Sequence, residues 1–147
     1  FDVRIKMRIS ARNQLKGTIV KVVEGAVNGV VTISLGNEEI KANITRESIK
    51  ELGLTEGKTA YAVIKATNVM FATGTERITN ISARNQLAGT IVKVTEGAVN
   101  GHVPHEMADG NVVSGSITNE AIESLGLKVG DPALAVIKAT DVMVGIE

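Results

Sequence analysis

Apolar and polar side chains alternate along much of the chain, in short runs separated by Gly-rich turns. In the first half these runs are Val3–Ile9, Thr18–Val23, Val30–Leu35, Glu39–Ile44 and Thr59–Ala66. A two-residue period in segments rich in β-branched residues is typical of half-buried β-strands. The pattern therefore predicts a mainly β protein built from short strands.

One short stretch between the fourth and fifth runs departs from this alternation. Arg46–Leu52 is predicted to form a helix, because Thr45 can cap its N-terminus and Gly53 can end it. Five strands with one short helix before the last strand favour a small Greek-key β-barrel of the OB type.

The chain contains an internal repeat. Ser10–Gly29, with the sequence SARNQLKGTIVKVVEGAVNG, returns at Ser82–Gly101 with two substitutions, and Ile44–Met70 returns at Ile117–Met143. The offset is 72 residues for the first pair of segments and 73 for the second, so one residue is inserted between them, around Gly36. A polar, Gly-rich hairpin turn tolerates such an insertion.

The repeat predicts two tandem OB-like barrels, one over residues 1–72 and one over residues 73–147. In the second copy Asn119–Leu125 is the expected helix, with Thr118 as its cap. A domain of this size buries only about 60% of the surface of its unfolded chain, and is marginally stable alone. We therefore expect the chain to form an oligomer.

Composition excludes several classes of protein. Sixteen Lys and Arg residues balance 16 Asp and Glu, and aromatic residues make up 2% of the 147 positions. Nucleic-acid-binding proteins usually carry a basic excess or aromatic stacking platforms, so no nucleic acid partner is expected. No apolar run approaches the roughly 18 residues of a membrane span. The absence of Cys excludes thiolate chemistry and fits a cytoplasmic protein.

No pattern of catalytic or metal-binding residues is present. The two histidines, His102 and His105, are three residues apart with Pro104 between them. An odd spacing on a strand puts them on opposite faces, and Pro disrupts strand pairing, so the pair is not expected to bind a metal. We expect a local bulge or strand edge there and no enzyme activity.

Three kinds of hydrogen-bond donor recur in both copies. Ser10 and Arg12, and likewise Ser82 and Arg84, would share one face of an extended segment and could hold an oxyanion, although a turn would use the same residues. Lys65 and Lys138 follow apolar runs and either extend to solvent or meet an anion.

The third kind of donor lies at the predicted helix starts. The hydroxyls of Thr45, Ser48 and Thr118 either cap the helix or bind an anion. The EGAVNG loops are typical of turns and also offer backbone amides. All these groups supply donors and none supplies a catalytic base, which favours a binding site for an anion.

The combination of SARNQL, GTIV, EGAVN, a short helix and VIKA resembles the Mop, or molbindin, family of molybdate- and tungstate-binding modules. The match covers both copies and nearly the whole chain. The resemblance implies cytoplasmic OB-like barrels that assemble around a threefold axis. The same double module forms the ligand-sensing part of molybdate-responsive transcription regulators.

The resemblance also assigns residues to oxyanion sites. One domain would hold the anion through a serine, an arginine, a lysine and a backbone amide, and a neighbouring domain would complete the site with helix-start hydroxyls. In the first copy these residues are Ser10, Arg12, Lys65, Ala66, Thr45 and Ser48, and in the second copy Ser82, Arg84, Lys138, Ala139 and Thr118. Ala121 replaces the second hydroxyl, which weakens the match there. A second kind of site would use Val27, Asn28, Val99 and Asn100.

The sequence therefore predicts a cytoplasmic protein that stores or buffers molybdate or tungstate without catalysis and without a catalytic cofactor. The metal would be bound as its oxyanion, not as a bare cation, by a homotrimer that needs no membrane. The alternative is the ligand-sensing part of a molybdate-responsive regulator. A nucleic-acid-binding OB domain is a third hypothesis, which charge and aromatic content disfavour.

Overall fold

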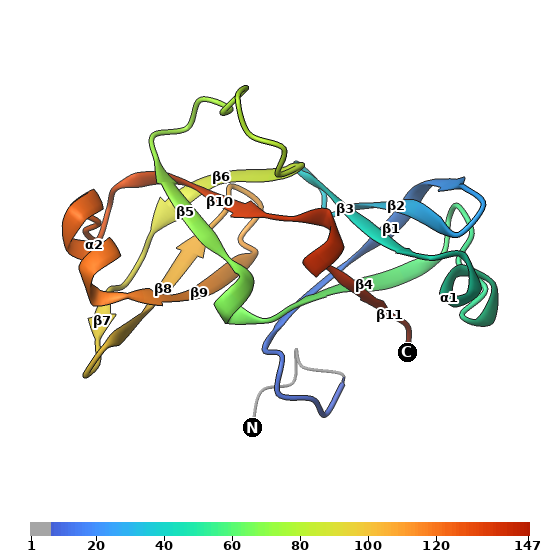
Figure 1. Cartoon of the computed structure of the whole chain (residues 1–147), viewed down its shortest axis with the longest axis horizontal. Coiled ribbons are helices and arrows are strands. Elements are labelled where there is room, and N and C mark those ends of the chain that lie inside the picture. Colours follow the sequence, from blue (N-terminus) through green and yellow to red (C-terminus); the bar gives the residue numbers. More distant parts are fainter. Residues whose placement is uncertain (1–6) are drawn as a thin grey trace. The chain divides into compact units, whose positions relative to one another are not determined.

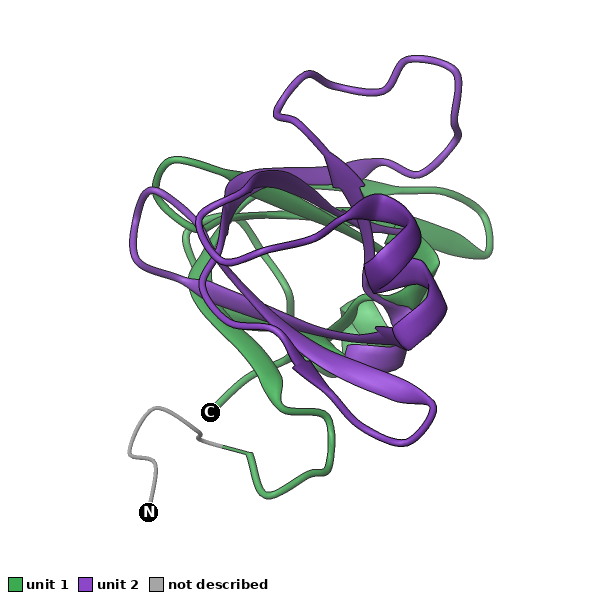
Figure 2. Cartoon of the chain, turned by 90° about the vertical axis from the view of Figure 1, so that its left-hand side faces the viewer, with its two compact units in different colours: residues 1–64, 139–147 green, residues 65–138 purple. Residues whose placement is uncertain are grey.

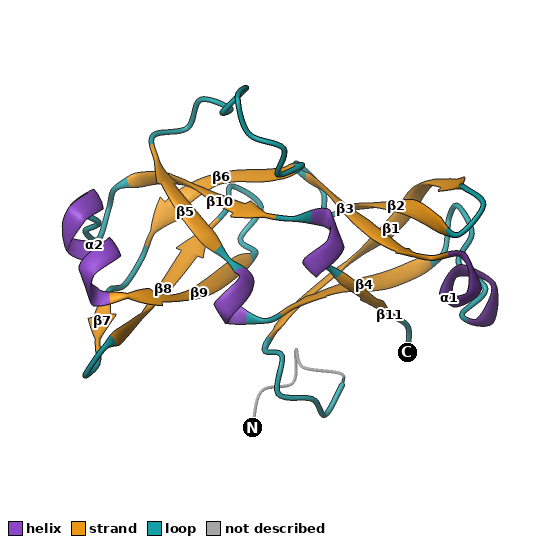
Figure 3. Cartoon of the chain, in the orientation of Figure 1, coloured by secondary structure: helices purple, strands orange, loops and turns teal. Residues whose placement is uncertain are grey.

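The structure is a computed structural model that describes residues 7–147. Strands dominate it, with two short α-helices and two 3-10 turns in the described part (Figure 3). The elements in chain order are β1 (Asn13–Glu24), β2 (Asn28–Ser34), β3 (Glu39–Thr45), α1 (Arg46–Glu51), β4 (Thr59–Ile64), η1 (Ala66–Asn68), β5 (Met70–Thr73), β6 (Asn85–Ile91), β7 (Thr95–Glu96), β8 (Asn100–Glu106), β9 (Val112–Thr118), α2 (Asn119–Leu125), β10 (Pro132–Ile137), η2 (Ala139–Asp141) and β11 (Met143–Gly145).

The chain forms two compact units, which Figure 2 distinguishes by colour. Unit 1 contains residues 1–64 and 139–147, and unit 2 contains residues 65–138. The strand order is β11-β4-β1-β2-β3 in unit 1 and β5-β10-β6-β8-β7 in unit 2, where β9 pairs with β8. The predicted fold, mainly β with two tandem units and one short helix in each, is confirmed.

The last strand of each sheet comes from the other sequence repeat. Antiparallel pairing places Met143 of β11 opposite Val63 of β4, and Met70 of β5 opposite Val136 of β10 (Figure 1). The two units therefore differ from the predicted division into residues 1–72 and 73–147. Repeat boundaries show which segments are equivalent, but they do not show to which sheet edge a terminal strand adds.

The predicted first strand, Val3–Ile9, is not found where the structure can be compared with it. Residues 3–6 lie outside the described part, and Met7–Ile9 form no strand. The side chain of Gln14 instead accepts a hydrogen bond from the backbone N–H of Met7 (3.2 Å) and donates to its carbonyl (3.1 Å). The backbone of Met7 is thus bonded to a side-chain amide.

Strands β4 and β10 are buried on both faces, which explains their unbroken apolar sequences. One face of β4 packs in the core of unit 1, where Ile33, Ile40 and Ile64 have no exposed surface. The other face carries Tyr61 and Val63, which pack with Ala11 and with the partly buried Met7. Each of these two strands therefore joins two apolar layers.

Both predicted helices form at the expected positions. Thr45 caps α1 and Thr118 caps α2, each through its side-chain oxygen. Gly53 and Gly126, with φ of 62° and 64°, adopt the left-handed conformation that ends a helix. Within residues 7–147 no helix is long and apolar enough to cross a membrane.

The repeats differ most around β8. His105 occupies the core position of Ile33 and has no exposed surface, whereas His102 is exposed, as the odd spacing predicts. The Nε2 atom of His105 lies 2.9 Å from the carbonyl oxygen of Ala133. Pro104 stays paired with β9, but the β6 side of the ladder is interrupted, so β6 and β7 replace the single long strand β1. Pro has no N–H to give to a second neighbour.

A hydrogen bond between Tyr61 and Glu147 joins the C-terminal segment to β4 of unit 1. The Tyr61 hydroxyl donates to Glu147 Oε1 (2.5 Å), and this bond, burial and the carboxylate charge together raise the pKa of Tyr61 to about 12. Since this pKa exceeds the ordinary value of about 10, the contact stabilises the fold below pH 10, and that stability is lost as the pH rises through about 12.

We predict that Glu147→Gln lowers the pKa of Tyr61 toward its ordinary value. Ultraviolet titration measures this directly, because the chain has one Tyr and no Trp. Glu56→Gln, at an exposed turn, is the matched control and leaves the titration unchanged. Equal titration curves for wild type and Glu147→Gln would contradict the contact.

At Gly89, strand β6 lies too close to β8 for a side chain to fit. A Cβ at this position would lie 2.4 Å from the carbonyl oxygen of Glu106 and 2.6 Å from Cε1 of His105. Gly89→Ala is expected to lower the free energy of unfolding by about 1–3 kcal/mol, since backbone cannot move aside cheaply. Chemical denaturation measures the change, with Thr90→Ala at the neighbouring exposed position as the control. An unchanged midpoint would rule out this close approach.

Candidate functional site

The SARN segments present their serine and arginine to solvent. Ala11 and Asn13 are each 5% exposed, whereas Ser10 and Arg12 between them are exposed. The second copy repeats this alternation, with Ser82 and Arg84 exposed. Within residues 7–147 neither serine hydroxyl makes a hydrogen bond. In each copy the serine and the arginine are therefore exposed together, and the described residues leave both serine hydroxyls free to donate.

Strand register brings the arginine and the lysine of each copy to the same strand end. Asn13 of β1 pairs with Ile64 of β4, so Arg12 and Lys65 are the next residues at that end. In the second copy Asn85 pairs with Ile137, so Arg84 and Lys138 are placed in the same way. Two predicted binding groups, about 50 residues apart in sequence, thus converge through one antiparallel pair.

The four cations at these strand ends have no ion-pair partner among residues 7–147. Arg12, Lys65, Arg84 and Lys138 are all exposed. In the described part of the chain, none of their side chains has a carboxylate or carbonyl partner. A guanidinium and an ammonium group at the same strand end favour a doubly charged anion.

A 3-10 turn begins directly after each lysine. Ala66 and Ala139, both half-buried, are the first residues of η1 and η2. The first N–H groups of a helical turn have no acceptor within that turn. These are the two backbone amides that the family resemblance places in the oxyanion site.

The helix-start hydroxyls lie at the opposite end of the unit. Register places Thr45 opposite Asn28, beside the end of β1 at Glu24. Arg12 precedes the other end of this 12-residue strand, roughly 35 Å along the strand at about 3.3 Å per residue. Figure 1 shows α1 at the end of unit 1 away from the start of β1. A single unit therefore does not bring Thr45 and Ser48 to Ser10 and Arg12.

The two helix starts differ in their hydroxyls. The Thr45 side chain accepts from the N–H of Ser48 (3.1 Å) and donates to the Ser48 hydroxyl (2.8 Å). The Thr118 side chain accepts from the N–H of Ala121 (3.1 Å), and Ala121 has no hydroxyl to add. The capping interpretation is confirmed in both copies, and the first copy has one more hydroxyl at this place.

The GAVN loops, residues 25–28 and 97–100, lie beside these helix starts. The carbonyl of Val27 accepts from the N–H of Arg46 (2.8 Å), and that of Val99 accepts from the N–H of Asn119 (2.8 Å). The valine side chains remain 73% and 70% exposed. Val27, Asn28, Val99 and Asn100 thus share the helix end of each unit, away from the SARN arginines.

Charge at the helix end also differs between the copies. In unit 1 Glu24 pairs with Arg46, whose Nε lies 3.6 Å from the carboxylate. In unit 2 Asn119 replaces this arginine and donates to the carbonyl of Gly97 (2.9 Å). Glu96 instead faces Glu123, and their hydrogen bond, with smaller contributions from burial and repulsion, raises the pKa of Glu96.

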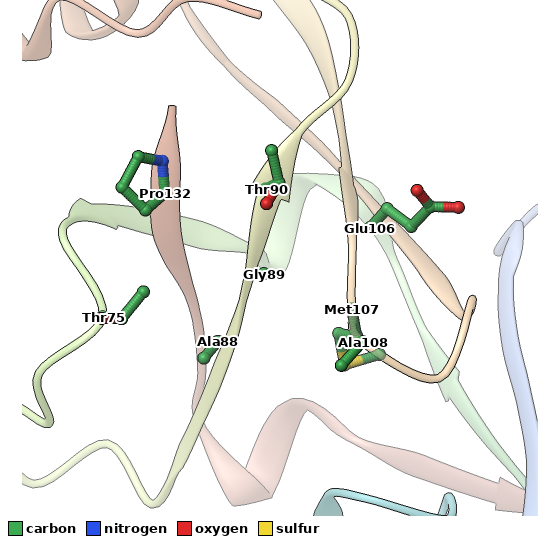
Figure 4. Close-up of a pocket in the computed structure, with 8 residues that line it drawn as sticks. All are labelled: Thr75, Ala88, Gly89, Thr90, Glu106, Met107, Ala108 and Pro132. Carbon is green, nitrogen blue, oxygen red and sulfur yellow. The ribbon is translucent and has the colours of Figure 1, made fainter. Parts of the chain in front are cut away.

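A shallow pocket in unit 2 contains none of the predicted site residues. It encloses about 490 Å³ beside Ala88 and Thr90 of β6, with Pro132 and Glu106 on its walls (Figure 4). Its described lining includes one carboxylate and no Lys or Arg, which does not suit an anion. Among residues 7–147 no cluster of His, Asp or Glu is arranged to hold a metal ion.

Arg77 is a cation beside the second-copy site that no sequence motif marks. Its Nη2 donates to the backbone carbonyl of Arg84 (3.2 Å), which brings a third cation to the SARN segment of unit 2. Arg77 lies between the repeated segments, where the two copies share no motif. Its basic character was the only available signal.

The pair of carboxyl groups of Glu96 and Glu123 makes the stability of unit 2 depend on pH. Because the pKa of Glu96 is raised in the folded state, stability falls as the pH rises through that pKa. Glu123→Lys copies Lys50 of the first helix and is expected to raise Tm at pH 7 by roughly 1–3 °C. The gain should be smaller near pH 3, where Glu96 is protonated. Thermal unfolding followed by circular dichroism checks this, with Glu120→Lys as control.

A family comparison identifies two copies of one domain. The TOBE domain matches residues 9–71 and 81–144. The molybdenum transport protein ModE of Herbaspirillum seropedicae is 39% identical over 98% of this chain and 54% of its own length. The molybdenum-pterin-binding protein MopA of Rhodobacter capsulatus is 36% identical over 97% of this chain and 54% of its own length. The chain thus spans about half the length of these curated relatives.

A solved structure matches the whole fold. The cytoplasmic molybdate-binding protein ModG, crystallised with molybdate bound, superimposes with a TM-score of 0.91 and 43% identity. The match covers 96% of this chain and 100% of the ModG chain. The resemblance to the Mop family is confirmed by these similarities. The chain therefore belongs to the TOBE-domain family, with one copy of the domain matched in each half of its sequence.

Proposed function

We propose that this chain binds molybdate or tungstate reversibly in the cytoplasm, for storage or homeostasis and without catalysis. One observation carries the proposal. In both copies an exposed serine and arginine converge with an exposed lysine at one strand end, and no carboxylate in the described chain neutralises the cations. Similarity to the molybdate-bound ModG structure supports the choice of anion.

The donor set matches the chemistry of a tetrahedral dianion. Arg12 and Lys65 supply two positive charges, which balance the two negative charges of molybdate. Ser10 and the Ala66 amide add neutral donors to the remaining oxygen lone pairs. Charge-assisted hydrogen bonds of this kind are strong and directional. No step requires a proton to move, so binding and release need no general acid or base.

A complete site requires a second unit. Thr45 and Ser48 lie about one strand length from Arg12 within unit 1, so the helix-start hydroxyls would reach an anion held by a different unit. We propose that the chain assembles as a homotrimer around a threefold axis to close these sites. Because such an assembly binds anion only when folded and associated, ligand should stabilise it by mass action.

The exposed GAVN loops are proposed as a second kind of oxyanion site. Val27, Asn28, Val99 and Asn100 lie next to the helix starts, with the valines among the most exposed apolar residues described. Contact between copies of these loops would remove the exposed valine side chains from water, which is favourable. This supports the proposal that the GAVN loops gather near the threefold axis.

A second candidate function follows from the lengths of the relatives. ModE and MopA match this chain over nearly its full length but extend to almost twice that length. The chain would then be the ligand-sensing part of a molybdate-responsive regulator. The coding sequence upstream of Phe1 separates the two functions, because a helix-turn-helix there would favour regulation over storage.

We predict that titration calorimetry detects molybdate and tungstate binding, with weaker or absent sulfate and phosphate binding. Replacing Arg12 and Arg84 together by Ala removes one charge-assisted donor from each copy. We expect the double variant to bind molybdate roughly 10–100-fold more weakly, with its fold unchanged. Lys93→Ala removes an exposed cation that lies outside the site and serves as the control.

Two results would contradict this proposal. Equal affinity for all four anions would remove the assigned ligand class, and wild-type affinity in the double variant would remove the arginines from the site. Light scattering on the same samples tests the assembly. A trimer has three times the 15.4 kDa mass of one chain.

A further inference from the structure

The loop that joins β5 to β6 is fastened to the SARN segment of unit 2. It projects from the sheet at the top of Figure 1. The side chain of Gln86 accepts from the N–H of Ile78 (2.7 Å), donates to its carbonyl (3.0 Å) and also donates to the carbonyl of Ala83 (3.2 Å). One side chain therefore ties the loop to the residue between Ser82 and Arg84.

Apolar packing holds the same loop residue in place. Ile78 packs against the buried cluster of Ala83, Leu134 and Val136. Hydrogen bonds fix its backbone, and this cluster fixes its side chain. The residue before it, Arg77, consequently starts from an anchored position although its own side chain is exposed.

Arg77 reaches the binding segment directly. Its Nη2 donates to the backbone carbonyl of Arg84 (3.2 Å). In the described chain no carboxylate pairs with this guanidinium, and the neighbouring Glu76 makes no ion pair. Three cations of unit 2, Arg77, Arg84 and Lys138, therefore belong to one end of the β6–β10 pair.

The contact also changes the polarity of the segment. A backbone carbonyl carries partial negative charge and repels a nearby oxyanion. A guanidinium bonded to that carbonyl covers the oxygen and leaves its other N–H groups free to donate. The Arg77 contact therefore replaces a repulsive group with an attractive one beside Arg84.

Unit 1 holds an equivalent anchor without a described equivalent cation. Gln14 bonds to the backbone of Met7 and to the carbonyl of Ala11, as Gln86 does to Ile78 and Ala83. The residue before Met7 in the sequence is Lys6, which lies outside the described residues. The link from Ile78 to Ser82 is one residue longer than that from Met7 to Ser10.

We propose that Arg77 is a further oxyanion-binding residue of the second-copy site, where it strengthens the selection of a dianion over a monoanion. This inference rests on the proposed function of the Ser82, Arg84 and Lys138 site. The role has two parts. The charge of Arg77 attracts the anion, and its hydrogen bond fixes the Arg84 carbonyl.

The experiment isolates the second-copy site by using the Arg12→Ala chain as background. Calorimetric titration with sodium molybdate compares this background with Arg77→Ala, Arg77→Gln and Arg77→Lys added to it. We expect Arg77→Ala to weaken binding about 3–10-fold, as for an exposed charge-assisted contact. Arg77→Lys keeps the charge and should recover most of the affinity. Arg77→Gln keeps a donor to the carbonyl without the charge and should recover less of it.

Salt dependence and selectivity separate a binding role from a structural one. The loss in Arg77→Ala should shrink at 0.5 M NaCl, because salt screens exposed charges. Perrhenate, a tetrahedral monoanion, should lose less affinity than molybdate. Lys93→Ala in the same background is the control. Added to Arg84→Ala instead, Arg77→Ala should have a much smaller effect.

The outcomes distinguish this inference from the proposed function. If the wild-type chain takes up no molybdate, both fail. If wild type binds and Arg77→Ala in the Arg12→Ala background binds as tightly as its parent at low salt, the role of Arg77 alone is overturned. Equal losses for molybdate and perrhenate, unaffected by salt, would also overturn it, because they indicate a positional effect of the loop.

Discussion

The antiparallel pairing of the SARN-led strand with the strand that precedes the lysine is the interaction on which the rest of the structure depends. In both copies this register places an asparagine opposite an isoleucine, Asn13 with Ile64 and Asn85 with Ile137. The apolar strand of each pair is buried on both faces and joins two layers of the core. The same pairing sets the arginine and lysine at one end, so a register shift would disrupt core and site together.

Each unit is small, and its sheet is completed from a distant part of the chain. Strands β5 and β11 add to sheets formed mainly by the other repeat. A terminal strand donated in this way covers a buried strand that would otherwise form an exposed sheet edge. The proposed binding site follows the same principle, because its donors lie at opposite ends of a unit. Folding, association and anion binding are then linked processes.

The two copies share a framework but offer different chemistry around it. Unit 1 has the Ser48 hydroxyl and the Glu24–Arg46 ion pair at its helix start, whereas unit 2 has Ala121 and a pair of carboxyl groups. At the other end, the Arg77 guanidinium of unit 2 has no counterpart among the described residues of unit 1. The described donors therefore differ at both ends of the two copies.

The sequence by itself determined most of the strands, the capped helices, the repeat and the candidate donors, because these depend on local periodicity, capping chemistry and residue type. His105 illustrates the limit, since spacing predicted opposite faces for the histidines but not that one would replace Ile33 in the core. The tertiary structure decided which edge each last strand joins, that Gln14 bonds to the backbone of Met7, and that Arg77 contacts Arg84. These contacts depend on where distant segments meet, and no local pattern of residues encodes that.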